Sequence, residues 1–288
     1  MSRAGPQAAT IAGVTAPTPR TVLCDLDGVV WLAHRPIPGA VEAIARLRAA
    51  GCRVLFVTNN SAPTLADHEA ALAAIGVDAT GAVLSSPMAA AQLVRPGASV
   101  LVAGGPGITE ALTRRGATPV VNDGTPLTAP VDAVMVGMHR DFDYARLTVA
   151  ATAVRDGARL IATNADSTYP TPDGLLPGGG SLVAAIATAA GAEPVVAGKP
   201  HEPMVALVVA TLTADGAGFN PSEVVMVGDR LDTDGAFAGR LGCRFALVRT
   251  GVTGGGAQLA DPAATTGGVR VDHDLADLAA LADLVAPA

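Results

Sequence analysis

The pattern that most constrains the fold is a regular alternation of short apolar runs with longer alanine- and leucine-rich segments. The apolar runs carry many β-branched residues, as strands buried on both faces do. The segments between them, such as GAVEAIARLRAAG and LADHEAALAAIG, have helical periodicity and end at glycines. This alternation predicts βαβ units and parallel sheets. The predicted strands are TVLCDL, RVLFVT, SVLVAG, DAVMVG, RLIAT, PVVAG, EVVMVG and RFALV.

The predicted elements fall into two α/β regions, one inserted into the other. We predict a doubly wound, Rossmann-like parallel-sheet core from residues 20–96 and 194–288, with an α/β domain inserted over 97–193. The hinges are expected near Arg95-Pro96-Gly97 and Glu193-Pro194. Residues 1–19 are predicted to form a flexible tail. Near the other end, GVRVD is predicted as a short strand and LADLAALADLV as a helix.

Charge and hydropathy exclude two classes of partner. The formal net charge is −7, and no dense run of Lys and Arg is present, so binding to a nucleic-acid backbone is not expected. No apolar stretch approaches the ~20 residues that a membrane span requires. We therefore expect neither a nucleic-acid partner nor a membrane association.

Cysteine usage and the first residues bear on the compartment. Cys24, Cys52 and Cys243 are too few and too scattered for a disulfide framework or a zinc site. Cys24 is expected to be a strand residue that faces away from Asp25. The first twenty residues contain scattered prolines and no continuous apolar region, so they do not resemble a signal peptide. These features predict a reduced, cytoplasmic protein.

Polar residues follow four of the predicted strands, where parallel sheets bind their ligands. DLDG follows the first strand, TNN the second, GKP the sixth and GDRLDTD the seventh. Asp25 and Asp27 are two residues apart and repel each other unless a cation lies between them. A third carboxylate, from Asp229, would complete the oxygen-only set of ligands that Mg²⁺ prefers. Lys199 and the Thr58 hydroxyl are suited to phosphate oxygens.

DLDGV, a strand ending in Thr, Gly-Lys-Pro and GDRLDTD occur in that order, and together they resemble the four motifs of the haloacid dehalogenase superfamily. VTNNS, the insertion after the second motif and ATNADSTYPTPDGLLPGGGSLVAAI are similar to its NagD-like branch, which includes para-nitrophenyl phosphatases and phosphoglycolate phosphatases. The resemblance runs from about residue 20 to the end. It implies a haloacid dehalogenase core with an inserted cap of the C2 type.

The resemblance also implies catalytic roles. Asp25 would attack phosphorus and form an aspartyl-phosphate, and Asp27 would be the general acid and base. Mg²⁺ would be held by the side chains of Asp25 and Asp229 and by the backbone carbonyl of Asp27. Lys199 would stabilise charge on the transferring phosphoryl group. An outer carboxylate would orient Lys199 and the metal waters, with Asp234 as first candidate and Asp232 as its competitor.

Further residues are expected around the substrate. Thr58, Asn59 and Asn60 are predicted to contact the phosphate. The resemblance implies that the cap segment Asn164–Gly180 reaches over the site, with Asn164 and Asp166 near the cleft. No role is predicted for four other residues that could approach it: Trp31, His139, Tyr169 and His201.

The expected function is hydrolysis of a small phosphomonoester by a Mg²⁺-dependent phosphatase. Polyol, sugar and glycolate phosphates are the candidate substrates, with para-nitrophenyl phosphate as a synthetic one. A phosphomutase and a non-catalytic sensor of metabolite phosphates are the alternatives, although a sensor would be expected to lack Asp25 or Asp27. Two copies could pair through the cap.

Overall fold

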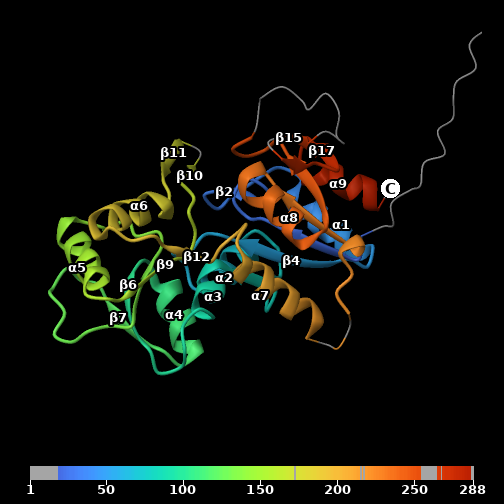
Figure 1. Cartoon of the computed structure of the whole chain (residues 1–288). Helices are drawn as coiled ribbons and strands as arrows, with labels where there is room; N and C mark the ends of the chain where they lie inside the picture. Colours follow the sequence, from blue (N-terminus) through green and yellow to red (C-terminus); the bar gives the residue numbers. More distant parts are fainter. Residues whose placement is uncertain are drawn as a thin grey trace, which may run out of the picture.

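The computed structural model describes residues 19–171, 173–214, 216, 218–253, 265–266 and 268–286. The expected N-terminal tail therefore lies outside the described residues, apart from Pro19. Figure 1 shows two α/β bodies beside each other, and one of them contains β1, α1 and α9, near the first and last described residues. No helix among the described residues is long and apolar enough to cross a membrane.

The core is a six-stranded, fully parallel sheet with the order β17-β14-β13-β1-β4-β5. This confirms the predicted α/β class with a doubly wound core. Four of its strands were predicted from apolar runs; the short edge strands β5 and β17 were not. The strands are β1 (Thr21–Cys24), β4 (Arg53–Thr58), β5 (Val83–Ser85), β13 (Val224–Gly228), β14 (Arg244–Val248) and β17 (His273–Leu275).

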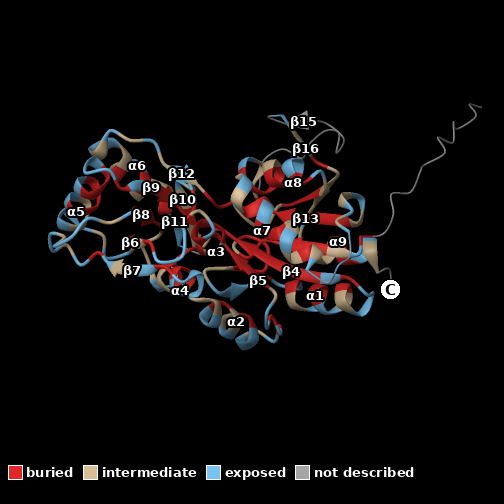
Figure 2. Cartoon of the chain, turned by 60° about the horizontal axis from the view of Figure 1, so that its bottom comes forward, coloured by how far each residue is buried: buried red, intermediate tan, exposed pale blue. Residues whose placement is uncertain are grey.

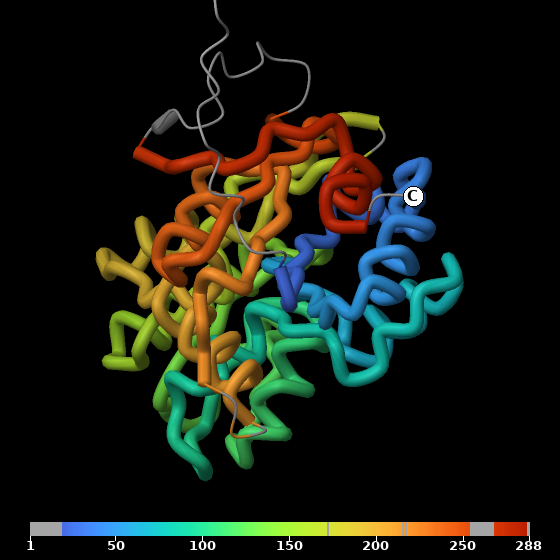
Figure 3. Tube along the Cα trace, turned by 90° about the vertical axis from the view of Figure 1, so that its right-hand side faces the viewer, coloured from blue at the N-terminus to red at the C-terminus, as the bar shows by residue number. Residues whose placement is uncertain are grey.

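Helices cover both faces of the core sheet because alternate strand residues point to opposite sides. Val22 and Cys24 pack with α1 (Ala40–Ala49) and α9 (Leu278–Val285), whereas Leu23 packs with the helices of the other face. Those helices are α3 (Ser86–Ala91), α7 (Glu202–Thr213) and α8 (Ala236–Leu241). Figure 2 shows the buried strands between them, and Figure 3 shows α9 beside α1. Cys24 is thus the strand residue that the sequence predicted.

The second body is a five-stranded parallel sheet with the order β12-β9-β8-β6-β7. One face is covered by α5 (Tyr144–Arg155) and α6 (Gly179–Ala190), and the other by α4 (Pro106–Arg115). We call this body the cap. Its strands are β6 (Ser99–Ala103), β7 (Thr118–Val121), β8 (Ala133–Val136), β9 (Arg159–Ala162) and β12 (Val195–Val196).

The return from cap to core lies slightly later than the sequence indicated. Val195 and Val196 pair with Ile161 and Ala162 of β9, so β12 belongs to the cap sheet. The chain therefore leaves that sheet after Val196, rather than near Glu193-Pro194 as predicted. The apolar residues of a two-residue strand could pack in either sheet, so composition could not show whether β12 belongs to the cap or to the core.

Smaller elements complete the chain. A hairpin of β10 (Thr168–Thr171) and β11 (Gly174–Pro177) extends from the cap, and α2 (Leu65–Ala74) follows the loop after β4. Another hairpin, β2 (Trp31–Leu32) with β3 (Arg35–Pro36), follows β1. The predicted strand GVRVD contains β16 (Val269–Arg270), which pairs with β15 (Thr265–Thr266). Two short turns flank β13: η1 (Pro221–Glu223) and η2 (Leu231–Gly235).

Candidate active site

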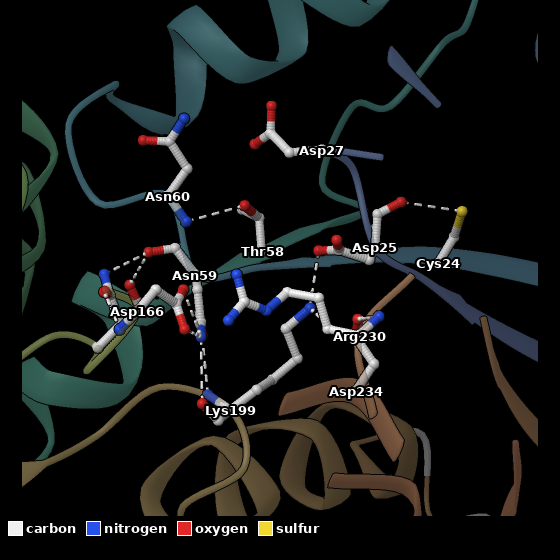
Figure 4. A network of polar contacts seen from close by, with 12 residues as sticks. Cys24, Asp25, Asp27, Thr58, Asn59, Asn60, Asp166, Lys199, Arg230 and Asp234 are labelled. Carbon is white, nitrogen blue, oxygen red and sulfur yellow. Dashed lines mark hydrogen bonds and ion pairs between the residues drawn. The ribbon is translucent and has the colours of Figure 1, made fainter. Parts of the chain in front are cut away.

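A pocket lies where the carboxyl ends of β1, β4 and β13 meet the cap. Parallel strands place the residues that follow them at one edge of the sheet, which is why separate polar stretches converge here. Figure 4 shows the side chain of Lys199 reaching toward Asp25, with Asp234 beside it. The pocket brings together all the predicted site residues except Asp232. Its lining includes Asp25, Asp27, Thr58, Asn59, Asn60, Asn164, Asp166, Lys199, Asp229 and Asp234.

Lys199 lies between two buried carboxylates. Its Nζ is 2.7 Å from Oδ1 of Asp25 and 2.7 Å from Oδ1 of Asp234. Burial alone would lower the pKa of Lys199, but the charges of Asp234 and Asp25 outweigh burial and raise it. Burial raises the pKa of Asp25, and the Lys199 ammonium opposes that rise. Lys199 therefore stays charged and keeps Asp25 closer to its ionised form.

The acidic groups of the pocket outnumber its buried ammonium group. One carboxylate oxygen from each of Asp25, Asp229 and Asp234 lies within 4.8 Å of the others. Lys199 offsets one charge, so two negative charges remain in excess when all three acids are ionised. Oδ1 of Asp229 is buried without a hydrogen-bond partner. Burial, followed by the charge of Asp234, raises the pKa of Asp229 to about 7. An unsatisfied oxygen in a buried, over-negative cluster fits a divalent cation with oxygen ligands, such as Mg²⁺.

Two glycines allow the Asp229 carboxylate to approach the backbone. Gly28 has a φ of +92°, and a Cβ at this position would lie 2.5 Å from Oδ2 of Asp229. A Cβ on Gly251 would collide with the same carboxylate. The glycine of DLDG thus serves both the turn and the close approach of Asp229.

The two candidate outer carboxylates occupy different environments. Asp234 is 1% exposed and ion-pairs with Lys199. The side chain of Asp232 is 71% exposed and pairs with Arg230 at 3.2 Å. Both belong to the turn η2, but only Asp234 faces the pocket. Of the two, Asp234 is therefore the one placed to orient Lys199.

Asp27 accepts hydrogen bonds from core and cap. Nε1 of Trp31 donates to its Oδ1 at 3.2 Å, and the hydroxyl of Tyr169, on β10 of the cap hairpin, donates to the same oxygen at 3.1 Å. Burial raises the pKa of Asp27 to about 6, and the two hydrogen bonds moderate that rise. A carboxyl group with a pKa near 6 exchanges protons readily near neutral pH.

Asn59 holds the strand end of the core to the Lys199 turn and to the cap. Its amide oxygen accepts the backbone N–H of Lys199 at 2.8 Å, and its amide nitrogen donates to the carbonyl of Lys199 and to Asp166. Asn164 donates to the backbone carbonyl of Asn59 at 2.8 Å. The side chains of Asn59 and Asn164 thus position other groups. Thr58 accepts the N–H of Asn60 at 3.0 Å, which leaves its hydroxyl proton available to a ligand.

Sequence reasoning assigned no contact to Tyr169 or Trp31 and did not consider Arg230, which also lines the pocket. Tyr169 lies in a Pro- and Gly-rich segment whose composition indicates only a loop. Arg230 lies inside GDRLDTD and could have been considered because it directly follows Asp229. His139 packs edge-on against Phe142, and His201 precedes α7; neither lines the pocket.

Comparisons with known proteins identify the family. A family model described as haloacid dehalogenase-like hydrolase matches residues 22–118, and a second, described as HAD-hydrolase-like, matches 196–278. The chain is 39% identical over 236 residues to D-glycerol 3-phosphate phosphatase of Mycobacterium tuberculosis. That match covers 80% of this chain but only 63% of the relative, less than two thirds of its length.

Two further similarities cover more of the matched protein. Chronophin of Mus musculus is 40% identical over 246 residues, covering 81% of each protein. A solved structure of a glycerol phosphate phosphatase from Mycobacterium tuberculosis, in complex with magnesium, has a TM-score of 0.79 at 36% identity. That similarity covers 95% of this chain and 80% of the solved chain.

Proposed function

Because this chain belongs to the haloacid dehalogenase-like hydrolases, we propose that it is a Mg²⁺-dependent phosphatase that hydrolyses small phosphomonoesters. The observation that carries the proposal is the buried cluster of Asp25, Asp229 and Asp234 around one ammonium group. Such a cluster is costly to desolvate and has an evident use in holding a cation against an anionic substrate.

The cofactor would be held by the side chains of Asp25 and Asp229 and by the backbone carbonyl of Asp27. Asp234 would lie outside these ligands and hold Lys199. When bound, Mg²⁺ would supply a positive charge that offsets the repulsion between the acidic groups and the substrate phosphate. The name of the magnesium-bound relative supports the same cofactor.

The first half of the reaction transfers the phosphoryl group to Asp25. A carboxylate oxygen of Asp25 bonds to phosphorus while the bond from phosphorus to the alcohol oxygen breaks. Asp27 gives its proton to that oxygen, and the alcohol leaves. Lys199 and the Thr58 hydroxyl hold the phosphoryl oxygens in line.

The second half returns the enzyme to its starting state. Asp27, now ionised, removes a proton from water as the water oxygen attacks phosphorus. The bond from phosphorus to Asp25 breaks, and inorganic phosphate leaves. Tyr169 and Trp31 orient the carboxyl group of Asp27 throughout, because both donate to its Oδ1. The cap above Asp27 limits the space for the leaving group, which favours small metabolite phosphates over macromolecules.

Location and assembly are the remaining parts of the proposal. The three free cysteines support a reduced, cytoplasmic protein. Val121 and Tyr144 of the cap are 68% and 83% exposed, which supports pairing of two copies through this body. Light scattering on the protein as it elutes from a size-exclusion column distinguishes a dimer from a monomer. If the protein is a dimer, Tyr144→Glu should shift it toward the monomer.

Phosphate release tests the activity. Wild-type protein with Mg²⁺ is expected to release phosphate from para-nitrophenyl phosphate and from some members of a panel of polyol, sugar and glycolate phosphates. Asp25→Asn should abolish release, and chelation of the metal should do the same. Binding without release would favour a sensor. Transfer of the phosphoryl group between positions of a sugar phosphate, without free phosphate, would favour a mutase.

A further inference from the structure

Arg230 presents a guanidinium group to the catalytic pocket that the proposed reaction does not use. Its side chain is only 16% exposed, and it lines the pocket with Lys199 and Asp166. Its backbone is fixed, because its N–H donates to Asp234 and its carbonyl accepts from Asp234 and Gly235. Figure 4 shows the guanidinium turned toward the centre of the polar network.

The ion pair of Arg230 with Asp232 is weak. The two contacts are 3.3 and 3.2 Å long, beyond the usual length of charge-assisted hydrogen bonds, and Asp232 is largely in solvent. The guanidinium therefore keeps donor capacity for a ligand. An arginine offers donors in a planar fork and no acceptor.

Asp166, which belongs to the cap, presents hydrogen-bond acceptors, whereas Arg230 presents donors. Two contacts from the Asn59 amide hold its carboxylate, at 3.1 and 3.3 Å, and its backbone is fixed by Asn164 and by Gly180. Burial raises the pKa of Asp166, and the charge of Arg230 is the largest influence that lowers it. Among the described residues, no ion pair with an N···O distance of 4.0 Å or less joins Asp166 to Arg230.

Resting on the phosphatase function proposed above, we propose that Arg230 and Asp166 recognise hydroxyl groups on the leaving alcohol, so that the preferred substrates are polyol phosphates. A hydroxyl both donates and accepts, so it can accept from the Arg230 guanidinium and donate to the Asp166 carboxylate. Because Asp166 comes from the cap and Arg230 from the core, a polyol would bridge the two bodies above the phosphate.

The same pair disfavours a leaving group that carries a carboxylate, such as glycolate. Arg230 would attract that carboxylate, but Asp166 would repel it in a pocket already rich in acids. An alkyl leaving group without hydroxyls would offer no partner to the remaining donors of Arg230 or to the remaining acceptor sites of Asp166. Hydrogen bonds to charged groups are stronger than those between neutral groups, so hydroxyls should determine specificity here.

The test compares two substrates that differ only in hydroxyl groups: glycerol 3-phosphate and propyl phosphate. The measured quantity is the ratio of their kcat/KM values in wild type, Arg230→Gln and Asp166→Asn. We expect the wild-type ratio to favour glycerol 3-phosphate by about 100-fold or more, and each variant to reduce the ratio by about tenfold or more. Using a ratio cancels any general loss of folded or active enzyme.

The possible outcomes separate this inference from the proposed function. If neither substrate nor para-nitrophenyl phosphate is hydrolysed, the phosphatase proposal fails. If both substrates are hydrolysed and the ratio of their kcat/KM values is the same in all three proteins, Arg230 and Asp166 do not recognise hydroxyl groups and the inference is wrong.

A second substrate pair, glycerol 3-phosphate and 2-phosphoglycolate, tests the role of Asp166. Asp166→Asn should shift preference toward phosphoglycolate by about tenfold, and no shift would contradict the role of Asp166.

Discussion

At the residue scale, the charge state of Lys199 controls how the site is organised. A lysine buried alone would lose its proton, whereas Lys199 has a raised pKa because two carboxylates lie 2.7 Å from its Nζ. Asp25 is one of these carboxylates and is also the proposed nucleophile. Asp234 has no other proposed chemical role, so its contribution is to hold Lys199 when Asp25 becomes phosphorylated.

Replacing Asp234 should therefore impair catalysis far more than replacing its neighbour Asp232. Asp234→Asn leaves Lys199 with one carboxylate, and we expect kcat to fall by about 100-fold or more. Asp232→Asn is the matched control, because it makes the same change at a side chain that is 71% exposed; its kcat should stay within about threefold of wild type. Steady-state kinetics with para-nitrophenyl phosphate measures both. Equal losses would show that Asp232 shares the role of Asp234.

Gly28 provides a second residue-scale prediction. Gly28→Ala places a Cβ 2.5 Å from Oδ2 of Asp229, at a φ of +92°. We expect a stability loss of about 1–2 kcal/mol from backbone strain, together with an increase of about tenfold or more in the Mg²⁺ concentration that half-activates the enzyme. Gly51→Ala has a similar φ of +86° and nothing within 4 Å, so it should show the stability loss alone. An unchanged Mg²⁺ requirement in Gly28→Ala would exclude the proposed placement of the metal.

Sequence patterns indicated which residues lie together where their positions follow from strand ends. Asp25 and Asp229 directly follow β1 and β13, Asp27 lies two residues beyond Asp25, and parallel pairing brings these positions together. The contacts of Asn59 and Tyr169 cross between the two bodies, as in the hydrogen bond from Tyr169 to Asp27. Nothing in a loop sequence indicates which distant carboxylate its tyrosine will meet.

At the element scale, the strands that could be predicted from the sequence are the longer and more fully buried ones. Strands such as β4 and β13 are almost wholly buried and were evident as apolar runs. The edge strands β5 and β17 have three residues each, too few to show a periodicity. Helix α2 is instead marked at its start, where Thr64 and Asp67 form a capping box directly after the site loop.

Helix α2 also contains a buried histidine that should make stability depend on pH. His68 is 1% exposed, and burial lowers its pKa below the ordinary value of 6.5. The unfolded chain then binds a proton more readily than the folded protein, so the free energy of unfolding falls as pH drops through about 6.5 and below.

Denaturant titrations at about pH 7.5 and about pH 5.5 test this dependence. His68→Gln should lose up to ~1.4 kcal/mol less stability between these pH values than wild type, because it removes one titrating group. If His68→Gln and wild type lose the same free energy, His68 does not contribute to the acid sensitivity.

At the scale of the whole molecule, cap and core are joined on two sides. At the pocket, Asn59 contacts Asp166 and Asn164, and the Ser61 hydroxyl accepts the N–H of Met138 at 3.0 Å. Away from the pocket, one apolar cluster contains residues of α3, α4 and α7 and strand residues of both sheets. Sequence patterns predicted two separate regions, because periodicity shows which residues are buried but not which body buries them.

This shared cluster predicts that cap and core unfold together. Trp31 is the single tryptophan and lies buried in the core, so its fluorescence reports on the core, whereas far-UV circular dichroism reports on the helices of both bodies. The two signals should give one coincident transition. Leu112→Ala, in α4 of the cap, should cost about 2–4 kcal/mol and shift the Trp31 transition as much as the dichroism. A dichroism shift that leaves the Trp31 transition unchanged would mean that the cap unfolds by itself, and the apolar contact would then be too weak to couple the two bodies.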